Sequence, residues 1–394
     1  MEAYVVDWLN LLVRWLHLTA GIAWIGASFY FVWLDNSLER PAHGANPRVF
    51  GELWSVHGGG FYHNEKFLLG PEKLPATLHW FKWEAYTTWL SGMALLAIVY
   101  WWGARTYLID PRVADLVPTT AVALSAGTLV AGWLVYDALC RLVKNELALG
   151  LSVYALLVVA AFGFQQVFSA RAAYIQVGAI IGTIMVWNVF FVIIPGQRRM
   201  VEAIRAGRTP DPEPGKRGKQ RSVHNNYFTL PVLFIMVSNH FPFTYAHRHG
   251  WVVLAVIMAA GVLIRHFFNL RHRGRLAPWL LAAGGALLVA LAVAIAPRTA
   301  PTASGEPAVG FAEANKVIAE RCAGCHAENP TYAGFTQPPG GVMLDTPERI
   351  RASAARIDQQ AVQTRAMPIG NLTNMTEAER ALLGRWIAGG AKID

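Results

Sequence analysis

The stretch Cys322-Ala323-Gly324-Cys325-His326 decides how this chain divides. Two cysteines separated by two residues and followed directly by histidine form the attachment pattern of c-type haem. In that chemistry the thiols of Cys322 and Cys325 add to the haem vinyl groups, and His326 becomes the proximal iron ligand. A disulfide or half of a zinc site are the alternatives. Neither explains the adjoining histidine, and the sequence nearby offers no second Cys/His pair for a tetrahedral zinc site. The stretch therefore predicts a covalent haem c.

The residues around this motif predict a small domain over 311–394, joined to the rest of the chain by a Pro-rich linker over 297–310. A helix is expected to lead into the motif. A closing helix is expected to start at Thr376, because Thr376 and Glu379 match the capping-box pattern. Two terminal helices that clamp a haem are typical of a class-I-like cytochrome c.

A methionine downstream of the motif is expected to supply the sixth ligand of the haem iron. Met367 fits best, because it lies on a loop shortly before the closing helix. Met343 and Met375 are less favoured. A methionine in such a loop can also fill the core.

The composition of the chain is that of a membrane protein. Its 394 residues are 54% hydrophobic and only 15% charged, whereas soluble domains average about 25% charged residues. Eight segments reach the roughly 20 apolar residues of a spanning helix, near 6–34, 83–102, 117–137, 147–168, 172–195, 226–245, 250–269 and 277–296. The predicted fold is all-α, with an eight-helix transmembrane bundle over 1–296 followed by the small cytochrome c domain.

The distribution of basic residues predicts the orientation of these helices. One set of alternate connections carries 19 lysines and arginines, and the other set carries 4. Positive charge marks the cytoplasmic side, so both termini are expected outside a bacterial inner membrane, with the cytochrome domain periplasmic. No cleavable signal peptide is evident at the N-terminus. The net charge of +9 is thereby explained by topology and gives no reason to expect a nucleic-acid partner.

Ionisable side chains within predicted spans are costly and mark candidate functional sites. Arg14, His17, Gly21 and Trp24 share one face of the first segment. Two interpretations of His17 stay open: a hydrogen-bonding residue of the helix packing, or a ligand of a second, non-covalent haem b. His240, in the outer part of its own segment, could share the same iron.

Two polar stretches are expected at the cytoplasmic side. The first is a glycine-containing loop over 57–66 that includes His63, and the second is the run His224-Asn225-Asn226-Tyr227. The amides and hydroxyls of the second run suit a planar heterocycle with alternating donors and acceptors. An ordinary helix start with asparagine capping would also explain the second run.

Together these stretches resemble the bacterial membrane-bound cytochrome c urate oxidases. The resemblance rests on 14–26, 57–66, 222–231 and 238–240 and covers essentially the whole chain. It implies oxidation of urate to 5-hydroxyisourate in purine catabolism, with electrons passed to haem c and then to a periplasmic cytochrome c or a terminal oxidase.

Oxidising urate also requires a base. The candidates are His224 and His63, while Asn225, Asn226 and Tyr227 would hold the ring. Two other classes of function stay open: a quinol-oxidising membrane cytochrome without urate chemistry, and a transporter with a cytochrome cap.

Overall fold

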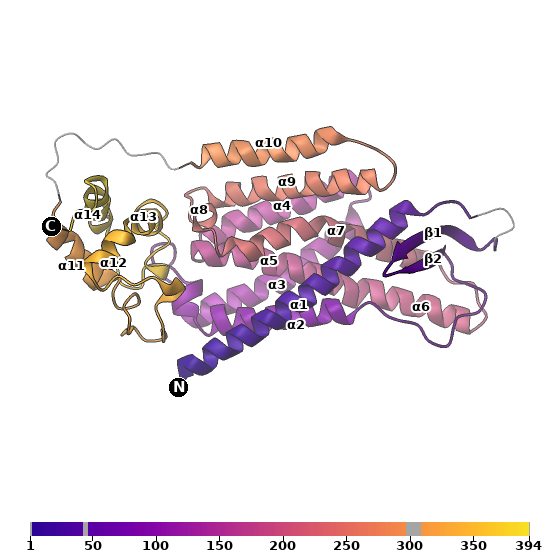
Figure 1. Ribbon diagram of the computed structural model, residues 1–394. Helices are drawn as coiled ribbons and strands as arrows, with labels where there is room; N and C mark the ends of the chain where they lie inside the picture. The colour runs from indigo at the N-terminus through magenta and orange to yellow at the C-terminus, as the bar shows by residue number, and fades with distance from the viewer. Residues whose placement is uncertain (1, 42–45, 297–308, 394) are drawn as a thin grey trace.

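The computed structural model describes residues 2–41, 46–296 and 309–393, most of them helical (Figure 1). Each of the eight predicted apolar segments overlaps a helix. In chain order these helices are α1 (Glu2–Ser37), α2 (Trp83–Leu95), α3 (Pro118–Leu142), α4 (Glu146–Gln165), α5 (Ala170–Trp187), α7 (Glu213–Ser238), α9 (Gly250–Arg271) and α10 (Pro278–Ala294). Within the described residues, five helical stretches are long and apolar enough to cross a membrane: Tyr4–Ser37, Pro118–Leu142, Glu146–Gln165, Ala170–Arg205 and Gly250–Arg271.

Local sequence explains where α4 starts, and two other helices continue beyond their α-helical part. The side chain of Asn145 caps α4 by accepting a hydrogen bond from Ala148 N at 2.9 Å. Two helices continue through π-helical turns: α2 into η1 (Leu96–Trp101), and α5 through η3 (Asn188–Ile193) into α6 (Ile194–Arg205). The latter makes one continuous helical stretch of 36 residues.

Helix α5 is the most buried of the five long apolar stretches and packs against α3, α4 and α7. Glycines at its contacts let the helices approach closely. A Cβ on Gly178 would lie 2.5 Å from Ile235 of α7, and a Cβ on Gly132 of α3 would lie 2.8 Å from Ile180. Small residues at such positions are the usual means of close packing between membrane helices.

One part of the all-α prediction is wrong. The stretch expected to be a polar loop forms an antiparallel hairpin of β1 (Val49–His57) and β2 (Gly60–Phe67). Gly58 and Gly59 make its two-residue turn with φ of +59° and +81°, which is the backbone that a type I′ hairpin turn requires. Aromatic and β-branched residues in the flanking runs, such as those in Val49–His57, favour strands.

The C-terminal part has its own hydrophobic core, distinct from that of the helix bundle. Its helices are α11 (Phe311–Arg321), α12 (Pro347–Ala352), α13 (Ala354–Ile357) and α14 (Glu377–Ala388), with short turns η4 (Pro339–Gly341), η5 (Asp358–Gln363) and η6 (Ile369–Asn371). The predicted capping box is confirmed, since Thr376 and Glu379 bond each other's backbone N–H groups. Ring contact between Phe311 and Trp386 joins α11 to α14. Most of the predicted linker lies outside the described residues.

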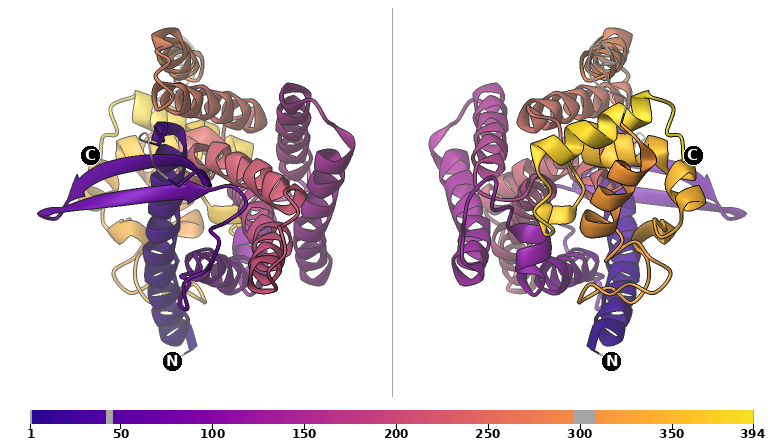
Figure 2. Two further views of the ribbon diagram at one scale, coloured as in Figure 1. Left: turned by 90° about the vertical axis from the view of Figure 1, so that its right-hand side faces the viewer. Right: turned by 90° about the vertical axis from the view of Figure 1, so that its left-hand side faces the viewer.

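The C-terminal helices and the β hairpin lie at opposite ends of the helix bundle (Figures 1 and 2). The C-terminal part contacts the bundle directly: Thr336 Oγ1 donates to Asp7 Oδ2 at 2.9 Å, and η6 packs on η2 (Ala104–Leu108). At the other end, Lys66 of the hairpin and Lys219 of α7 both bond Asp35 of α1. Each end of the bundle therefore carries its own additional structure.

Candidate functional site

The run His224-Asn225-Asn226-Tyr227 lies inside α7, where successive side chains point about 100° apart. It therefore does not converge on one point. His224 and Asn225 face α3 and η3, whereas Asn226 and Tyr227 face α9. The predicted ring-holding set is divided between two polar clusters, one on each side of the helix.

The first cluster is a buried hydrogen-bonded chain. Asn188 Nδ2 donates to Tyr136 Oη at 3.0 Å and to Asn225 Oδ1 at 3.1 Å, and Tyr136 Oη lies 2.8 Å from His224 Nδ1. Because the phenol oxygen already accepts from Asn188, its hydrogen is free to be donated to Nδ1. The proton of neutral His224 then sits on Nε2, which lies 3.7 Å from the exposed carboxylate of Glu146.

Charge in this first cluster is balanced by its own residues. Arg221 is 4% exposed and donates to Asp137 Oδ1 at 2.6 Å. Its guanidinium also lies 4.9 Å from the centre of the Tyr136 ring. Asp137 accepts a second bond from Arg141 at 2.7 Å. A buried arginine is tolerated here because a carboxylate accompanies it.

The second cluster joins α7 to α9. Asn226 Oδ1 accepts two hydrogen bonds of 2.9 Å, from Arg265 Nε and from Asn269 Nδ2. Tyr227 Oη lies 2.6 Å from His266 Nδ1. Sequence reasoning missed Arg265 and Asn269. The available signal was their i, i+4 spacing, which places two polar side chains on one face of an otherwise apolar helix.

The hairpin keeps His63 apart from both clusters. His63 is exposed, its Nε2 lies 2.9 Å from Glu52 Oε2, and its ring stacks on Trp54 at 4.4 Å. Among the described residues no hydrogen bond or ring contact joins it to α7. The pairing of His63 with His224 around one substrate is thus not supported by any contact.

His17 of α1 is held in a way that suits a metal ligand. Its Nδ1 lies 2.9 Å from Thr88 O and 3.1 Å from Ser91 Oγ, and a bond from Nδ1 to a carbonyl leaves Nε2 available. The ring packs against Gly92 of α2, where a Cβ would lie 3.0 Å from His17 Cε1. His240 follows α7 and is exposed, and no contact in the described part of the chain links it to His17. Haem b therefore stays a prediction, with His17 the better fitting of the two residues.

The predicted haem c motif forms a tight turn at the end of α11. The backbone N–H of His326 donates to Cys322 O at 2.9 Å, and the ring Nδ1 of His326 donates to Val342 O at 2.9 Å. Histidines that ligate metals are usually oriented by this second bond, which leaves Nε2 for the metal. Burial and the nearby Cys325 thiol raise the pKa of Cys322 to about 12, so the unreacted thiol is neutral at pH 7. These residues fit a haem attached through Cys322 and Cys325 with His326 on its iron.

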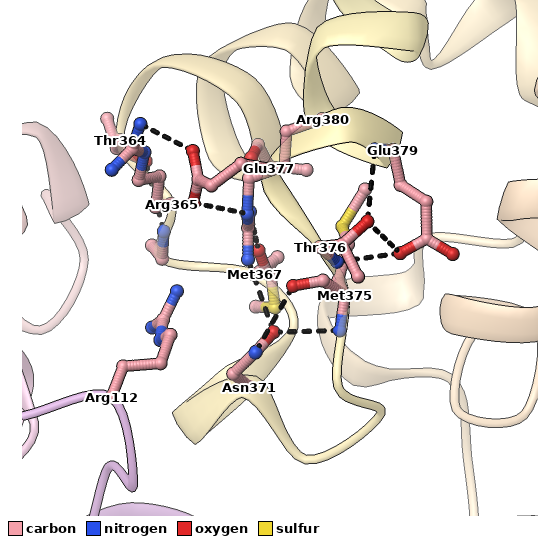
Figure 3. Close-up of polar contacts among 12 residues, drawn as sticks. Arg112, Thr364, Arg365, Met367, Asn371, Met375, Thr376, Glu377, Glu379 and Arg380 are labelled. Atoms are coloured by element: carbon pink, nitrogen blue, oxygen red, sulfur yellow. Dashed lines mark hydrogen bonds and ion pairs between the residues drawn. The ribbon is translucent and has the colours of Figure 1, made fainter.

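The loop that carries Met367 is fixed by Arg380 of α14 (Figure 3). Arg380 is 2% exposed and donates to Met367 O at 2.7 Å and to Asn371 Oδ1 at 3.3 Å. Met367 is half-buried and packs against the C-terminal core, whereas Met375 is a buried member of that core. The structure thus uses Met375 as core filling. Met343 is half-buried like Met367, and Met367 as the sixth ligand stays a prediction.

A cleft of about 2000 Å³ lies between this loop and the facing end of the helix bundle, beside the place where η6 packs on η2. Its walls come from both parts of the chain, Met367 and Asn371 on one side and Arg171, Tyr245 and His249 on the other. Arg112 points toward the Met367 loop from the bundle side (Figure 3). The predicted sixth ligand therefore faces the helix bundle.

Comparison with known proteins gives one match. A family model described as urate oxidase N-terminal matches residues 3–296, which include α1 to α10 and end before the C-terminal helices. No curated protein and no solved structure matches the chain.

Proposed function

Because the chain belongs to the urate oxidase N-terminal family, we propose that it oxidises urate to 5-hydroxyisourate and passes the electrons to a haem c on its C-terminal domain. The reaction adds water to the ring: urate and H₂O give 5-hydroxyisourate, two protons and two electrons. The family match over 3–296 is the observation that carries the urate assignment. The motif at Cys322 to His326 is what supports the electron acceptor.

Haem c, when bound, would accept these electrons one at a time. The chain's own part is to hold the group: Cys322 and Cys325 by thioether bonds, His326 through Nε2 and Met367 through its sulfur. Arg380 keeps the Met367 loop in place through its bond to Met367 O. The position of this loop across the cleft from the bundle supports electron arrival from the urate oxidase domain.

His224 is our candidate for carrying a proton from the buried interior to solvent. Its imidazole links buried Tyr136 to the exposed carboxylate of Glu146, so a proton taken up inside can leave toward solvent. The exposed His63, held by Glu52 on the hairpin, has no such connection. His17 would be the ligand of a haem b, and no step of the reaction is assigned to it.

The proposed setting is a bacterial inner membrane with both termini outside. Five helices long and apolar enough to span support the membrane location, and the charge bias of the connections supports the orientation. The C-terminal domain is then periplasmic, where a soluble cytochrome c or a terminal oxidase would take the electrons onward.

The decisive experiment is anaerobic mixing of the purified full chain with urate while urate loss and haem c reduction are followed together. We expect two haem c reduced per urate consumed. A protein whose haem c is reduced by a quinol and not by urate would overturn the proposal and leave a quinol-oxidising cytochrome. Accessibility of a C-terminal tag in intact cells tests the orientation separately.

A further inference from the structure

Arg265 is a buried cation without a counter-anion. Three arginines among the described residues are at most one-tenth exposed: Arg221, Arg265 and Arg380. Arg221 bonds Asp137 at 2.6 Å, and Arg380 has Glu377 at 3.8 Å. For Arg265, 5% exposed, no carboxylate of the described chain lies within 4.0 Å. A buried unpaired charge is strongly unfavourable, so this site is incomplete as the protein alone forms it.

The neighbours of Arg265 are also incomplete. Three buried atoms in this cluster have no hydrogen-bond partner: Arg265 Nη2, Asn226 Nδ2 and Asn269 Oδ1. Asn226 is 0% exposed and Asn269 is 7% exposed. Buried polar groups nearly always have partners, and each one left unsatisfied costs free energy. A ligand that completes this site would therefore be an anion that accepts two hydrogen bonds and donates one.

The arrangement is held rigidly. Arg265 Nε and Asn269 Nδ2 both donate to Asn226 Oδ1 at 2.9 Å. On another side the Arg265 guanidinium carbon lies 4.0 Å from the centre of the Phe29 ring of α1, a distance typical of a cation–π contact. These bonds fix the orientation of all three side chains, so their unpaired atoms are preorganised.

The site lies toward the hairpin end of the bundle. Arg265 is six residues before the end of α9, or about 9 Å along the helix axis. Arg273, just beyond that end, donates to Asn36 Oδ1 of α1 at 2.9 Å. Arg265 therefore lies nearer to this end of the bundle than to the C-terminal domain.

We propose that Arg265, Asn226 and Asn269 bind the purine substrate as a planar anion. Arg265 supplies the counter-charge, Asn226 Nδ2 donates to a ring carbonyl, and Asn269 Oδ1 accepts from a ring N–H. This inference rests on the proposed function and assigns the substrate to the α7–α9 cluster. In the His224 cluster Arg221 Nη1 and Asn188 Oδ1 also lack hydrogen-bond partners among the described residues, but Arg221 already has Asp137 as its counter-ion. A neutral quinol would leave Arg265 without its anion.

The test compares two variants. Arg265→Gln removes the positive charge, and Asn269→Asp places a carboxylate beside Arg265 that serves as its counter-ion in place of the substrate. We expect either variant to raise KM for urate at least tenfold, since charge-assisted bonds are the strong ones. The rise in thermal stability that urate gives the wild type should also disappear. Arg273→Gln removes a charge from the same end of α9 without touching the cluster, and should match the wild type.

The outcomes separate the two proposals. Unchanged KM and unchanged urate stabilisation in a folded Asn269→Asp protein would overturn this assignment while urate oxidation by the wild type stands. A wild type that neither oxidises urate nor is stabilised by it would overturn the proposed function. Haem c absorbance and unfolding without urate report whether each variant is folded. If Arg265→Gln does not fold, the more conservative Asn269→Asp decides.

Discussion

Gly370 offers a direct test of how the C-terminal domain is seated on the bundle. It has φ of +54° in η6, and a Cβ there would lie 3.1 Å from Ile109 O and 3.2 Å from Thr106 O. Gly370→Ala therefore adds two penalties. The left-handed backbone costs an alanine about 1–2 kcal/mol, and the new methyl forces the two backbones apart by a few tenths of an ångström.

Gly340 is a matched control, because its φ of +64° carries the same backbone strain while nothing lies within 4 Å of its Cβ position. The strain should lower the unfolding temperature of the C-terminal domain similarly in Gly370→Ala and Gly340→Ala. Only Gly370→Ala should also weaken the contact between the C-terminal domain and the helix bundle. A weakening of about 1.4 kcal/mol lowers the ratio of molecules with this contact formed to molecules with it broken tenfold.

The assay is anaerobic stopped-flow reduction of haem c by urate, with thermal unfolding of the C-terminal domain as the companion measurement. We expect slower reduction in Gly370→Ala and an unchanged rate in Gly340→Ala. Equal rates in the two variants would refute the reasoning, because the interface contact is the difference between them.

Three further changes test other parts of the structure. Gly92→Ala should displace the His17 ring, and we expect the ratio of haem b to haem c in purified protein to fall; an unchanged ratio would leave His17 as a packing residue. Met367→Leu preserves volume but removes the thioether, so the haem c potential should fall; a potential equal to that of wild type would exclude Met367 as ligand. The pKa of Glu379 is held below its usual range because hydrogen bonds from Arg321 and Thr376 outweigh its burial. The stabilisation by Glu379 is therefore complete above the pKa of an unfolded carboxyl and is lost as pH falls through the lowered value. Glu379→Gln should accordingly make the free energy of unfolding fall less steeply on acidification. The same pH dependence of the unfolding free energy in both proteins would contradict this.

Features encoded by adjacent residues could be predicted from the sequence. The capping box at Thr376 and Glu379 needs only four residues, and each predicted apolar segment needs only its own composition. The hairpin was missed because a polar, glycine-containing stretch was interpreted as a loop. The available signal for strands was the pair Gly58 and Gly59 between two runs with aromatic residues, the first of which also contains valines.

The candidate site could be predicted only in part. Four consecutive polar residues in one helix cannot face one ligand, so the division of His224 and Asn225 from Asn226 and Tyr227 follows from helix geometry once α7 is recognised as continuous there. The partner of Asn226 is a different matter. Arg265 is 39 residues away on another helix, and no local pattern pairs them.

The continuous helix Ala170–Arg205 has a consequence for the shape of the protein in a bilayer. Its 36 residues measure about 54 Å, whereas the hydrocarbon layer is about 30 Å thick. Roughly 20 Å of it must stand clear of the lipid tails, and α6 projects from the hairpin end of the bundle (Figure 1). Helix α6 packs against the first turns of α7, and the two helices together form a rigid extension into the aqueous phase. In a thinner or thicker bilayer a different length of this helix pair would lie within the lipid, while its far end would stay in water.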